Sequence, residues 1–320
     1  MPSTLSSWYP STNHEMLIQR ANILKQIRHF FDSRRLLEVE TPLMSRATIT
    51  DPHLEGFPVM VGQEQAYLQT SPEYAMKRLL AAGFPDIYQL CKAFRVDEAG
   101  RYHNPEFTML EWYRLGFDLH QLMDDVDDLF QTILQCLPAQ RITYQDIFAS
   151  LEIDPFKATI ADCQQIAIKR GMQFSDAVMN SSKDTWLQLL FSTFIEPDLG
   201  FDAPVFVYDF PASQASLARL HPDSPDIAMR VEVFINGMEL GNGFDELQDA
   251  SLQKQRFEED NATRTALGLK EKPIDPQLLN ALGHGLPQCS GIAIGVDRLI
   301  MCALKKQRIE EVLAFDWSRA

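Results

Sequence analysis

Apolar and polar residues alternate along two stretches within residues 94–112, and a polar loop separates the two stretches. Successive side chains of a strand point to opposite faces, so Arg95 and Asp97 share one face of the first stretch, while Phe107 and Glu111 share one face of the second. If the stretches pair as a hairpin, one sheet face carries cationic, anionic and aromatic groups together. A solvated outer face collects the same kinds of residue, so this pattern alone leaves both interpretations open.

Hydrophobic spacing predicts the other elements of the chain. Asn13 is a suitable N-cap for a helix whose apolar stripe ends at Phe31, and Ser71 followed by Pro72 predicts the start of another helix. The remaining predicted elements are helices over residues 118–136 and 248–267, strands over 57–61, 66–69, 205–210, 229–235 and 238–244, and a buried strand that runs into a helix over 290–304. Strand hairpins with helices grouped between them indicate the α+β class rather than an alternating parallel sheet.

A second hairpin is predicted at Asn236-Gly237, because Asn-Gly is the strongest signal for a two-residue turn. Glu232 and Glu239 lie on opposite sides of this turn, so the hairpin can bring the two carboxylates near one another. Paired carboxylates beside phosphate groups are the usual way to hold Mg²⁺. Acidic residues on hairpins are common, so the pair alone is weak evidence for a metal site.

The chain is expected to form one large domain behind a short tail. Residues 1–12, rich in Ser, Thr and Pro, predict a flexible tail, and residues 13–320 predict the folded domain. Residues 137–200 have mostly helical patterns and no cluster that suggests chemistry, so we interpret them as a helical insertion. The sequence contains no internal repeats.

Composition narrows the function classes. The 320 residues include 29 Lys and Arg against 44 Asp and Glu, for a formal net charge of -15, which argues against charge-driven nucleic-acid binding because that requires a basic surface. The five cysteines are far apart and odd in number, which favours free thiols in a reducing compartment. No apolar run approaches the length of a membrane span and the N-terminus has no signal core, so we expect a cytoplasmic protein without a membrane partner.

Several catalytic templates are absent from the sequence, namely the P-loop, His-Glu-x-x-His and Gly-x-Ser-x-Gly. The acidic residues within 124–128 are interpreted as a solvated helix face rather than a metal site. What remains is two arginines, Arg95 and Arg298, on separate elements that also carry carboxylates. This combination suits a polyphosphate ligand, because the planar donors of arginine bind phosphate oxygens bidentately.

Three stretches in order resemble the motifs of class II aminoacyl-tRNA synthetases, specifically those of the lysine enzyme's catalytic domain. RHFFDSRRLLEVETPLM is similar to the first motif, FRVDEAGRYHNPEF to the second and GIAIGVDRL to the third, and TSPEY, HNPEFTMLEWY and GMELGNGFDELQDA lie between them or overlap them. The resemblance runs from about Asn13 to the C-terminus. It implies an antiparallel sheet flanked by helices, a homodimer formed through the first motif, and activation of an amino acid by ATP with Mg²⁺.

The resemblance also implies roles for individual residues. Arg95 would hold the α-phosphate and the amino acid's carboxylate and Arg298 the γ-phosphate, so both are expected to be catalytic. The residues expected to bind ATP are Arg95, Asp97, His103, Asn104, Phe107, Glu239, Leu240, Gly295 and Arg298, with Glu232 and Glu239 expected to bind Mg²⁺. The residues expected to bind the amino acid are Ser71, Glu73, Tyr113, Asn242, Glu246 and Ala293. Among these, Glu73 would pair with the backbone-side ammonium and Asn242 with the carboxylate, and Glu246 and Tyr113 with the side-chain ammonium. Carboxylates at opposite ends of a pocket suit a dication such as lysine, because an unpaired buried ammonium is costly.

The chain departs from lysyl-tRNA synthetases in three places. Those enzymes carry an anticodon-binding OB-fold of about 100 residues or more before the first motif, whereas here the first motif begins at Arg28, so we expect no tRNA partner. The third motif has Ala293 where the lysine enzymes have glycine. The second motif has Asp97 where a longer glutamate is usual, which leaves open whether Asp97 or Glu98 contacts adenine.

With these departures, the chain resembles stand-alone paralogues of the family, which attach (R)-β-lysine to a lysine of translation elongation factor P. The resemblance implies activation of (R)-β-lysine, with α-lysine used more weakly, and transfer to the ε-amine of a lysine on that acceptor protein. Two alternatives remain open: a truncated lysyl-tRNA synthetase-like ligase that acts on another amine, and a non-catalytic regulatory paralogue. Retention of both motif arginines and both candidate Mg²⁺ carboxylates argues against the regulatory paralogue.

Overall fold

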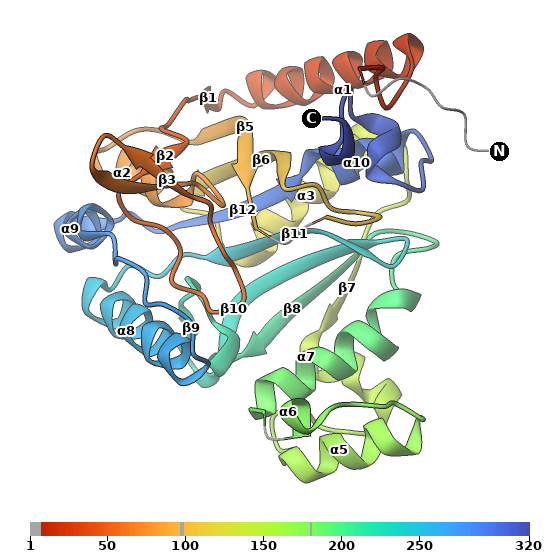
Figure 1. Ribbon diagram of the computed structural model, residues 1–320, viewed down its shortest axis with the longest axis vertical. Coiled ribbons are helices and arrows are strands. Elements are labelled where there is room, and N and C mark those ends of the chain that lie inside the picture. Colours follow the sequence, from red (N-terminus) through yellow and green to blue (C-terminus); the bar gives the residue numbers. More distant parts are fainter. Residues whose placement is uncertain (1–7, 97–98, 180) are drawn as a thin grey trace. The chain divides into compact units, whose positions relative to one another are not determined.

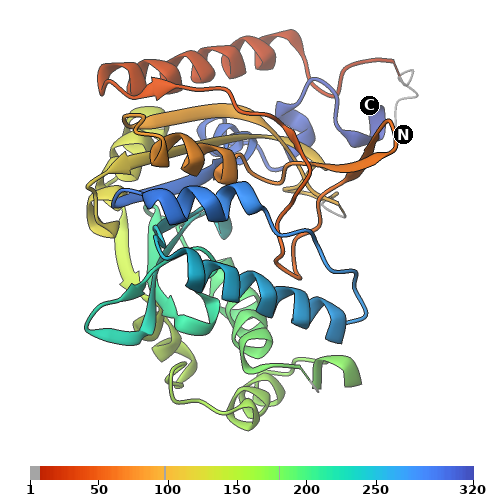
Figure 2. The ribbon, with the colours of Figure 1, turned by 90° about the vertical axis from the view of Figure 1, so that its left-hand side faces the viewer.

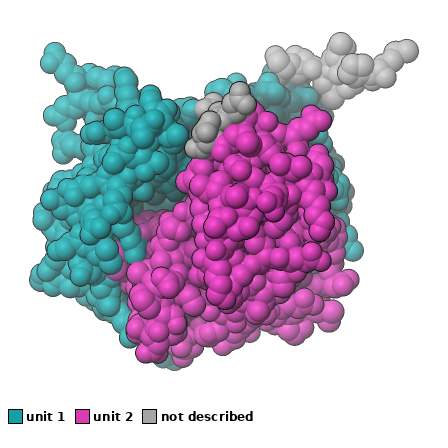
Figure 3. All heavy atoms as spheres, turned by 90° about the horizontal axis from the view of Figure 1, so that it is seen from below, with its two compact units in different colours: residues 1–117, 132–134, 248–320 teal, residues 118–131, 135–247 magenta. Residues whose placement is uncertain are grey.

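The computed structural model describes residues 8–96, 99–179 and 181–320. It divides into two compact units (Figure 3): unit 1 is Met1–Phe117, Thr132–Leu134 and Gln248–Ala320, and unit 2 is Asp118–Gln131 and Gln135–Leu247. Each unit contains β-sheet of mixed strand direction together with helices, so the predicted α+β class is confirmed. Within the described part of the chain, no helix is long and apolar enough to cross a membrane.

The main strands of unit 1 are neighbours in the order β1 (Leu37–Glu38), β5 (Ile87–Phe94), β6 (Glu106–Leu115) and β12 (Cys289–Gly295). Strands β5, β6 and β12 are antiparallel to their neighbours, and β1 pairs parallel to β5. β5 and β6 pair as a hairpin, as predicted, with β6 over the predicted second strand. The first strand was placed too late in the sequence, because β5 ends at Phe94 and Arg95 follows it.

A small sheet and a set of helices complete unit 1. The small sheet is antiparallel, in the order β2 (Met44–Ser45), β4 (Glu64–Leu68) and β3 (Pro58–Val61). The helices are α1 (His14–Ser33), α2 (Glu73–Ala81), α8 (Ala250–Ala266), α9 (Pro276–Gly285) and α10 (Val296–Ala303), followed by the 3-10 turns η4 (Ile309–Val312) and η5 (Trp317–Arg319). Helices α2, α9 and α8 lie side by side in that order (Figure 2).

Strand register assigns the side chains of the main unit 1 strands to two faces. Helix α1 covers one face (Figure 1), where its Phe31 stacks on Tyr88 with ring centroids 4.6 Å apart and meets Trp112 at 5.2 Å. Tyr88 and Trp112 are opposite one another in the pairing of β5 with β6. Because side chains alternate along each strand, Glu111 and its partner Ala293 in β12 point to the other face. This second face is available for a site.

The segment that precedes α1 is bound to the C-terminal segment of unit 1. The Ser11 backbone N–H donates to the Ala314 carbonyl at 2.8 Å, and the Thr12 hydroxyl donates to the Glu311 carbonyl at 2.6 Å. Asn13 caps α1 as expected, since its side chain accepts a hydrogen bond from the Met16 N–H. These contacts hold residues 11–13 in place at the start of α1.

Unit 2 has neighbouring strands in the order β11 (Met238–Asp245), β10 (Ser224–Ile235), β8 (Val205–Pro211) and β7 (Gln140–Thr143), with β9 (Leu220–His221) beside β10. β10 is antiparallel to β11, β8 and β9, and β7 is parallel to β8. Asn236 and Gly237 form the predicted two-residue turn, with φ of 54° and 68°. Both values lie in the left-handed region that such turns require.

Helix α3 (Leu119–Leu134), predicted over residues 118–136, begins in unit 2 and is capped by Asp118. Between residues 137 and 200 the described residues are mostly helical after β7, a strand that the sequence analysis did not predict. The elements there are α4 (Tyr144–Ile147), η1 (Phe148–Leu151), α5 (Ile160–Lys169), α6 (Asp176–Met179), α7 (Lys183–Phe194) and η2 (Glu196–Asp198), and η3 (Ala212–Gln214) follows β8.

Candidate active site

A buried carboxylate, Glu111, is the centre of a hydrogen-bonded group on the second face of the unit 1 strands. The Ser71 hydroxyl donates to Glu111 Oε2 and the Tyr113 hydroxyl donates to Glu111 Oε1, both at 2.6 Å. Burial, together with the nearby charge of Glu73, raises the pKa of Glu111 to about 7, although these two hydrogen bonds act in the opposite direction. The structure thus brings two predicted ligand-binding residues, Ser71 and Tyr113, to a carboxylate that the sequence analysis assigned no role.

Glu73 lies at the start of α2, beside this group. Its Oε1 accepts from the buried ammonium of Lys77, one helical turn later, at 2.6 Å. The Glu73 N–H donates to the Ser71 hydroxyl oxygen at 3.1 Å, so Ser71 links the start of α2 to Glu111. Lys77 was missed by the sequence analysis, because a lysine in a helix pattern is usually a solvated residue.

Ala293 projects from β12 toward the same side of the sheet. It is directly opposite Glu111, while Gly291 is opposite Tyr113 and Gly295 is opposite Met109. The alanine methyl is therefore the only β-carbon that β12 places on this face between residues 291 and 295. This geometry makes Ala293 the residue of β12 that shapes the space in front of Glu111.

Arg95 and Phe107 come together at the loop end of the β5–β6 hairpin. The Arg95 guanidinium carbon lies 5.1 Å from the centroid of the Phe107 ring, within the range of a cation–π contact. The Asn104 side chain donates to the Glu106 carbonyl at 2.6 Å and accepts from the Trp317 N–H at 2.8 Å, which joins the loop to the C-terminal segment. Two further positions named in the sequence analysis, 97 and 98, lie outside the described residues.

Arg298, in the first turn of α10, lies next to His103. Its Nη2 is hydrogen-bonded to His103 Nε2, and its Nε donates to the Tyr102 carbonyl at 3.2 Å. The preceding residue, Asp297, is buried and fixes this turn: it pairs with Arg20 of α1 at 2.7 Å and accepts from the Thr108 N–H of β6 at 2.7 Å. Asp297 and Arg20 carry no sequence signal for this contact, because 277 positions separate them.

In unit 2, strand register gathers four predicted site residues on one face of the β10–β11 hairpin. Glu239 is opposite Phe234, so it shares the face of Phe234 and Glu232. A bulge between Val233 and Phe234 then places Asn242, instead of its neighbour, opposite Glu232. Leu240 is buried at this bulge, and alternation brings Glu246, also buried, to the same face as Asn242.

Glu232 and Glu239 interact electrostatically. Burial raises the pKa of Glu232, Arg230 lowers it and the charge of Glu239 raises it again. Arg230 ion-pairs with Glu232 and donates to Asn242 Oδ1 at 3.2 Å, so a residue that the sequence analysis did not name links two predicted site residues. Among the described residues no group of three or more His, Cys, Asp or Glu could hold a metal ion. Mg²⁺ that is carried by nucleotide phosphates needs only one or two protein carboxylates, and Glu232 with Glu239 fits that requirement.

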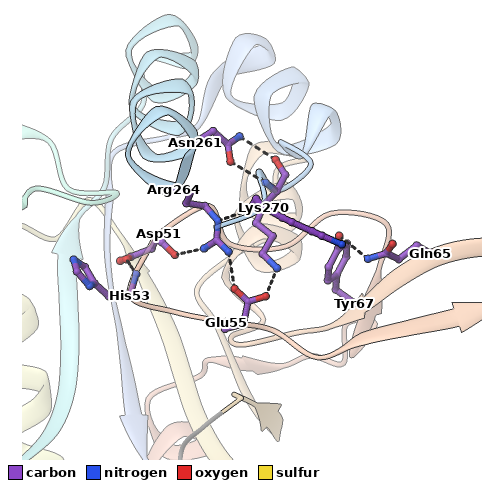
Figure 4. Close-up of polar contacts among 9 residues, drawn as sticks. Asp51, His53, Glu55, Gln65, Tyr67, Asn261, Arg264 and Lys270 are labelled. Atoms are coloured by element: carbon purple, nitrogen blue, oxygen red, sulfur yellow. Dashed lines mark hydrogen bonds and ion pairs between the residues drawn. The ribbon is translucent and has the colours of Figure 1, made fainter. Parts of the chain in front are cut away.

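A loop between β2 and β3 contacts helix α8 (Figure 4) and the segment that follows β5. Its Glu55 accepts from the buried Arg264 of α8 at 2.6 Å and also pairs with Lys272. The Glu55 carbonyl accepts from the Val96 N–H at 2.8 Å. One residue of this loop therefore contacts both α8 and the segment just after β5.

Comparison with known proteins identifies relatives along the whole chain. The family model for tRNA synthetases class II (D, K and N) matches residues 5–318. A protein of Edwardsiella ictaluri named elongation factor P–(R)-β-lysine ligase is 52% identical over 326 residues, covering 99% of this chain and 100% of the relative. A protein of Vibrio cholerae with the same name is 53% identical over 325 residues, with the same coverage.

Proposed function

The chain belongs to the class II tRNA synthetase family of the D, K and N type, and we propose that it activates (R)-β-lysine with ATP and transfers it to a lysine of elongation factor P. α-Lysine is a weaker substrate in this proposal. Relatives about 50% identical to this chain over its whole length carry the ligase name, which favours neither a tRNA-charging enzyme nor a regulatory paralogue.

The reaction has two steps. A carboxylate oxygen of the amino acid attacks the α-phosphorus of ATP, the bond to pyrophosphate breaks, and an acyl-adenylate forms. The neutral ε-amine of the acceptor lysine then attacks the acyl carbon, loses a proton and displaces AMP, which leaves an amide. No nucleophile of this chain is required. Positioning and charge stabilisation by Arg95 and Arg298 supply the catalysis in this proposal.

The observation that carries the proposal is the buried Glu111 group. Glu111, held by Ser71 and Tyr113, lies on the face of Ala293, and Glu73 begins the adjacent helix α2. Two carboxylates with different surroundings in one unit suit a ligand with two ammonium groups. Glu111 would bind the side-chain ammonium, a role that the resemblance gave to Glu246 and to Tyr113, whose hydroxyl donates to Glu111. Glu73 would bind the other ammonium.

Mg²⁺ would be held by Glu232 and Glu239, which share one face of the β10–β11 hairpin. When bound, the ion would neutralise phosphate charge that the arginines do not. We further propose a homodimer formed through the first motif, a cytoplasmic location, and no role for tRNA. If tRNA(Lys) were charged as efficiently as elongation factor P is modified, this last part would be wrong.

The direct test is intact-mass analysis of elongation factor P after incubation with this protein, ATP, Mg²⁺ and one lysine isomer at a time. We expect a mass increase of one lysyl group, fastest with (R)-β-lysine. Reactions without ATP, and reactions with Arg298→Ala, serve as controls and should give little product. An unmodified acceptor with every isomer would refute the proposal.

A further inference from the structure

Arg230 of β10 makes contacts to two strands and a turn of unit 2. Its Nε donates to Asn242 Oδ1 at 3.2 Å, its Nη2 pairs with Glu232, and its Nη1 donates to the Gln214 carbonyl at 2.9 Å. The guanidinium carbon also lies 4.7 Å from the centroid of the Phe210 ring. Only 18% of the side chain is exposed, so these contacts fix the guanidinium in one place.

The contact with Asn242 determines how that side chain is oriented. A guanidinium only donates hydrogen bonds, whereas a carboxamide has one accepting oxygen and one donating nitrogen. Because Oδ1 accepts from Arg230, the Nδ2 donors of Asn242 point away from the arginine. A carboxylate can accept from Nδ2 but is repelled by Oδ1, so the orientation of the amide decides whether Asn242 can bind an acid.

We propose that Arg230 is a positioning residue for the amino acid substrate: it holds Asn242 with Nδ2 presented to the substrate carboxylate. This inference rests on the proposed function and on the role that the resemblance implies for Asn242, which is to bind that carboxylate. The bulge that places Asn242 opposite Glu232 is part of the arrangement, because it lets one guanidinium reach the side chains of both residues. Arg230 itself does not touch the substrate.

A purely structural role would act through the Gln214 carbonyl alone, by holding η3 against β10. Arg230→Lys separates the two roles, because an ammonium keeps the charge beside Glu232 but cannot bridge three acceptors as the planar guanidinium does. Arg141→Lys is the matched control. Arg141 is also an arginine of the unit 2 strands, paired with Asp124 and 5.9 Å from the Phe206 ring.

The first experiment is amino-acid-dependent ATP–pyrophosphate exchange in a double-mutant cycle with Asn242→Ala. We expect Arg230→Lys to raise KM for the amino acid at least about tenfold, the size of one lost hydrogen bond to a charged group, with a smaller change in kcat. In the Asn242→Ala background the same change should cost less than about twofold, because the two residues act as one unit. Arg141→Lys should leave KM unchanged. If the costs of the two substitutions multiply, or if KM does not rise, the inference is wrong.

A second readout does not depend on activity. With asparagine labelled by ¹⁵N, the side-chain amide signal of Asn242 is identified by its loss in Asn242→Ala. We expect this signal to shift in Arg230→Lys and to stay in place in Arg141→Lys, and an unmoved signal in both variants would refute the inference. If the unchanged protein shows no exchange with any amino acid, the proposed function fails and this signal alone decides the role of Arg230. Arg230→Gln replaces Arg230→Lys in both measurements if the lysine variant does not fold.

Discussion

Replacing Ala293 by glycine should change which lysine isomer is activated. Ala293 is opposite Glu111, and its neighbours on that face of β12 are Gly291 and Gly295. The substitution therefore removes the only β-carbon that residues 291–295 place on that face and leaves three glycines there. The resemblance to lysyl-tRNA synthetases places this position beside the amino group of the bound amino acid. An α-ammonium approaches the strand more closely than a β-ammonium, which is one carbon further from the carboxylate.

The expected magnitude is that of one methyl group in a pocket, about 1–3 kcal/mol or roughly 10- to 200-fold in kcat/KM. Glu111 is held from two sides by Ser71 and Tyr113, so it has little freedom to move away from the alanine methyl. We therefore expect Ala293→Gly to raise the ratio of kcat/KM for α-lysine to that for (R)-β-lysine by about tenfold or more. Glycine in a strand interior also costs about 0.5–1 kcal/mol of folding free energy.

The assay is ATP–pyrophosphate exchange with each isomer, in the wild type and in Ala293→Gly. Ala66→Gly, in the small sheet, controls for the loss of stability that any strand glycine causes, and it should leave the isomer ratio unchanged. Thermal unfolding of both variants confirms that they are folded at the assay temperature. If the ratio in Ala293→Gly stays within about twofold of the wild type, the methyl does not discriminate between the isomers and our account of the pocket is wrong.

Three further predictions follow from the same contacts. Arg298→Ala should reduce exchange at least tenfold, because a charge-assisted phosphate contact contributes about 1.5–3 kcal/mol, whereas the control Lys306→Ala should not; near-normal exchange in Arg298→Ala would refute the third-motif assignment. Burial raises the pKa of Glu111 to about 7, and the ionised form of Glu111 is the one that binds a cation. KM for the amino acid should therefore fall as the pH rises toward 7, and Glu111→Gln should flatten that dependence. Arg264→Met should lower the free energy of unfolding by about 2 kcal/mol in denaturant titration, because it leaves the carbonyls of Asp51 and Lys270 without the donors of the buried guanidinium, while exposed Arg46→Met should cost less than about 1 kcal/mol; equal losses would contradict the contacts of Figure 4.

Strand β6 and the Asn236-Gly237 turn could be predicted because their signals are local, whereas the strand before β6 was placed too late in the sequence. Strict alternation fixes which residues share a face, and a two-residue turn fixes that Glu239 is opposite Phe234, hence on the side of Glu232. The position of Asn242 could not be obtained in this way. Unbroken pairing from the turn would place Gly241 opposite Glu232, and only the bulge brings Asn242 there.

The Glu111 group shows a different limit of sequence analysis. Alternation placed Glu111 on a face, but not opposite Ala293, because the register of β6 with β12 joins residues 182 positions apart. The hydroxyls that donate to Glu111 belong to Tyr113, two residues later in the same strand, and to Ser71, just before α2. A pattern of apolar and polar positions contains no information on such long-range contacts. These contacts identify Glu111, which the sequence alone would assign to a solvated face, as a candidate substrate-binding residue.

Charge patterns were least informative for α8, whose sequence is typical of a solvated helix because its residues are mostly polar or charged. Arg264 is nevertheless only 1% exposed, and its guanidinium donates to the carbonyls of Lys270 and Asp51 and to the carboxylate of Glu55. Through these hydrogen bonds, the C-terminal end of α8 holds the loop after β2 in place. Because the Glu55 carbonyl also accepts from the Val96 N–H, these contacts extend to the residue after Arg95. A change in α8 that frees Glu55 would therefore loosen the backbone beside the arginine proposed to bind the α-phosphate, so residues far from the substrate contribute to how that arginine is held.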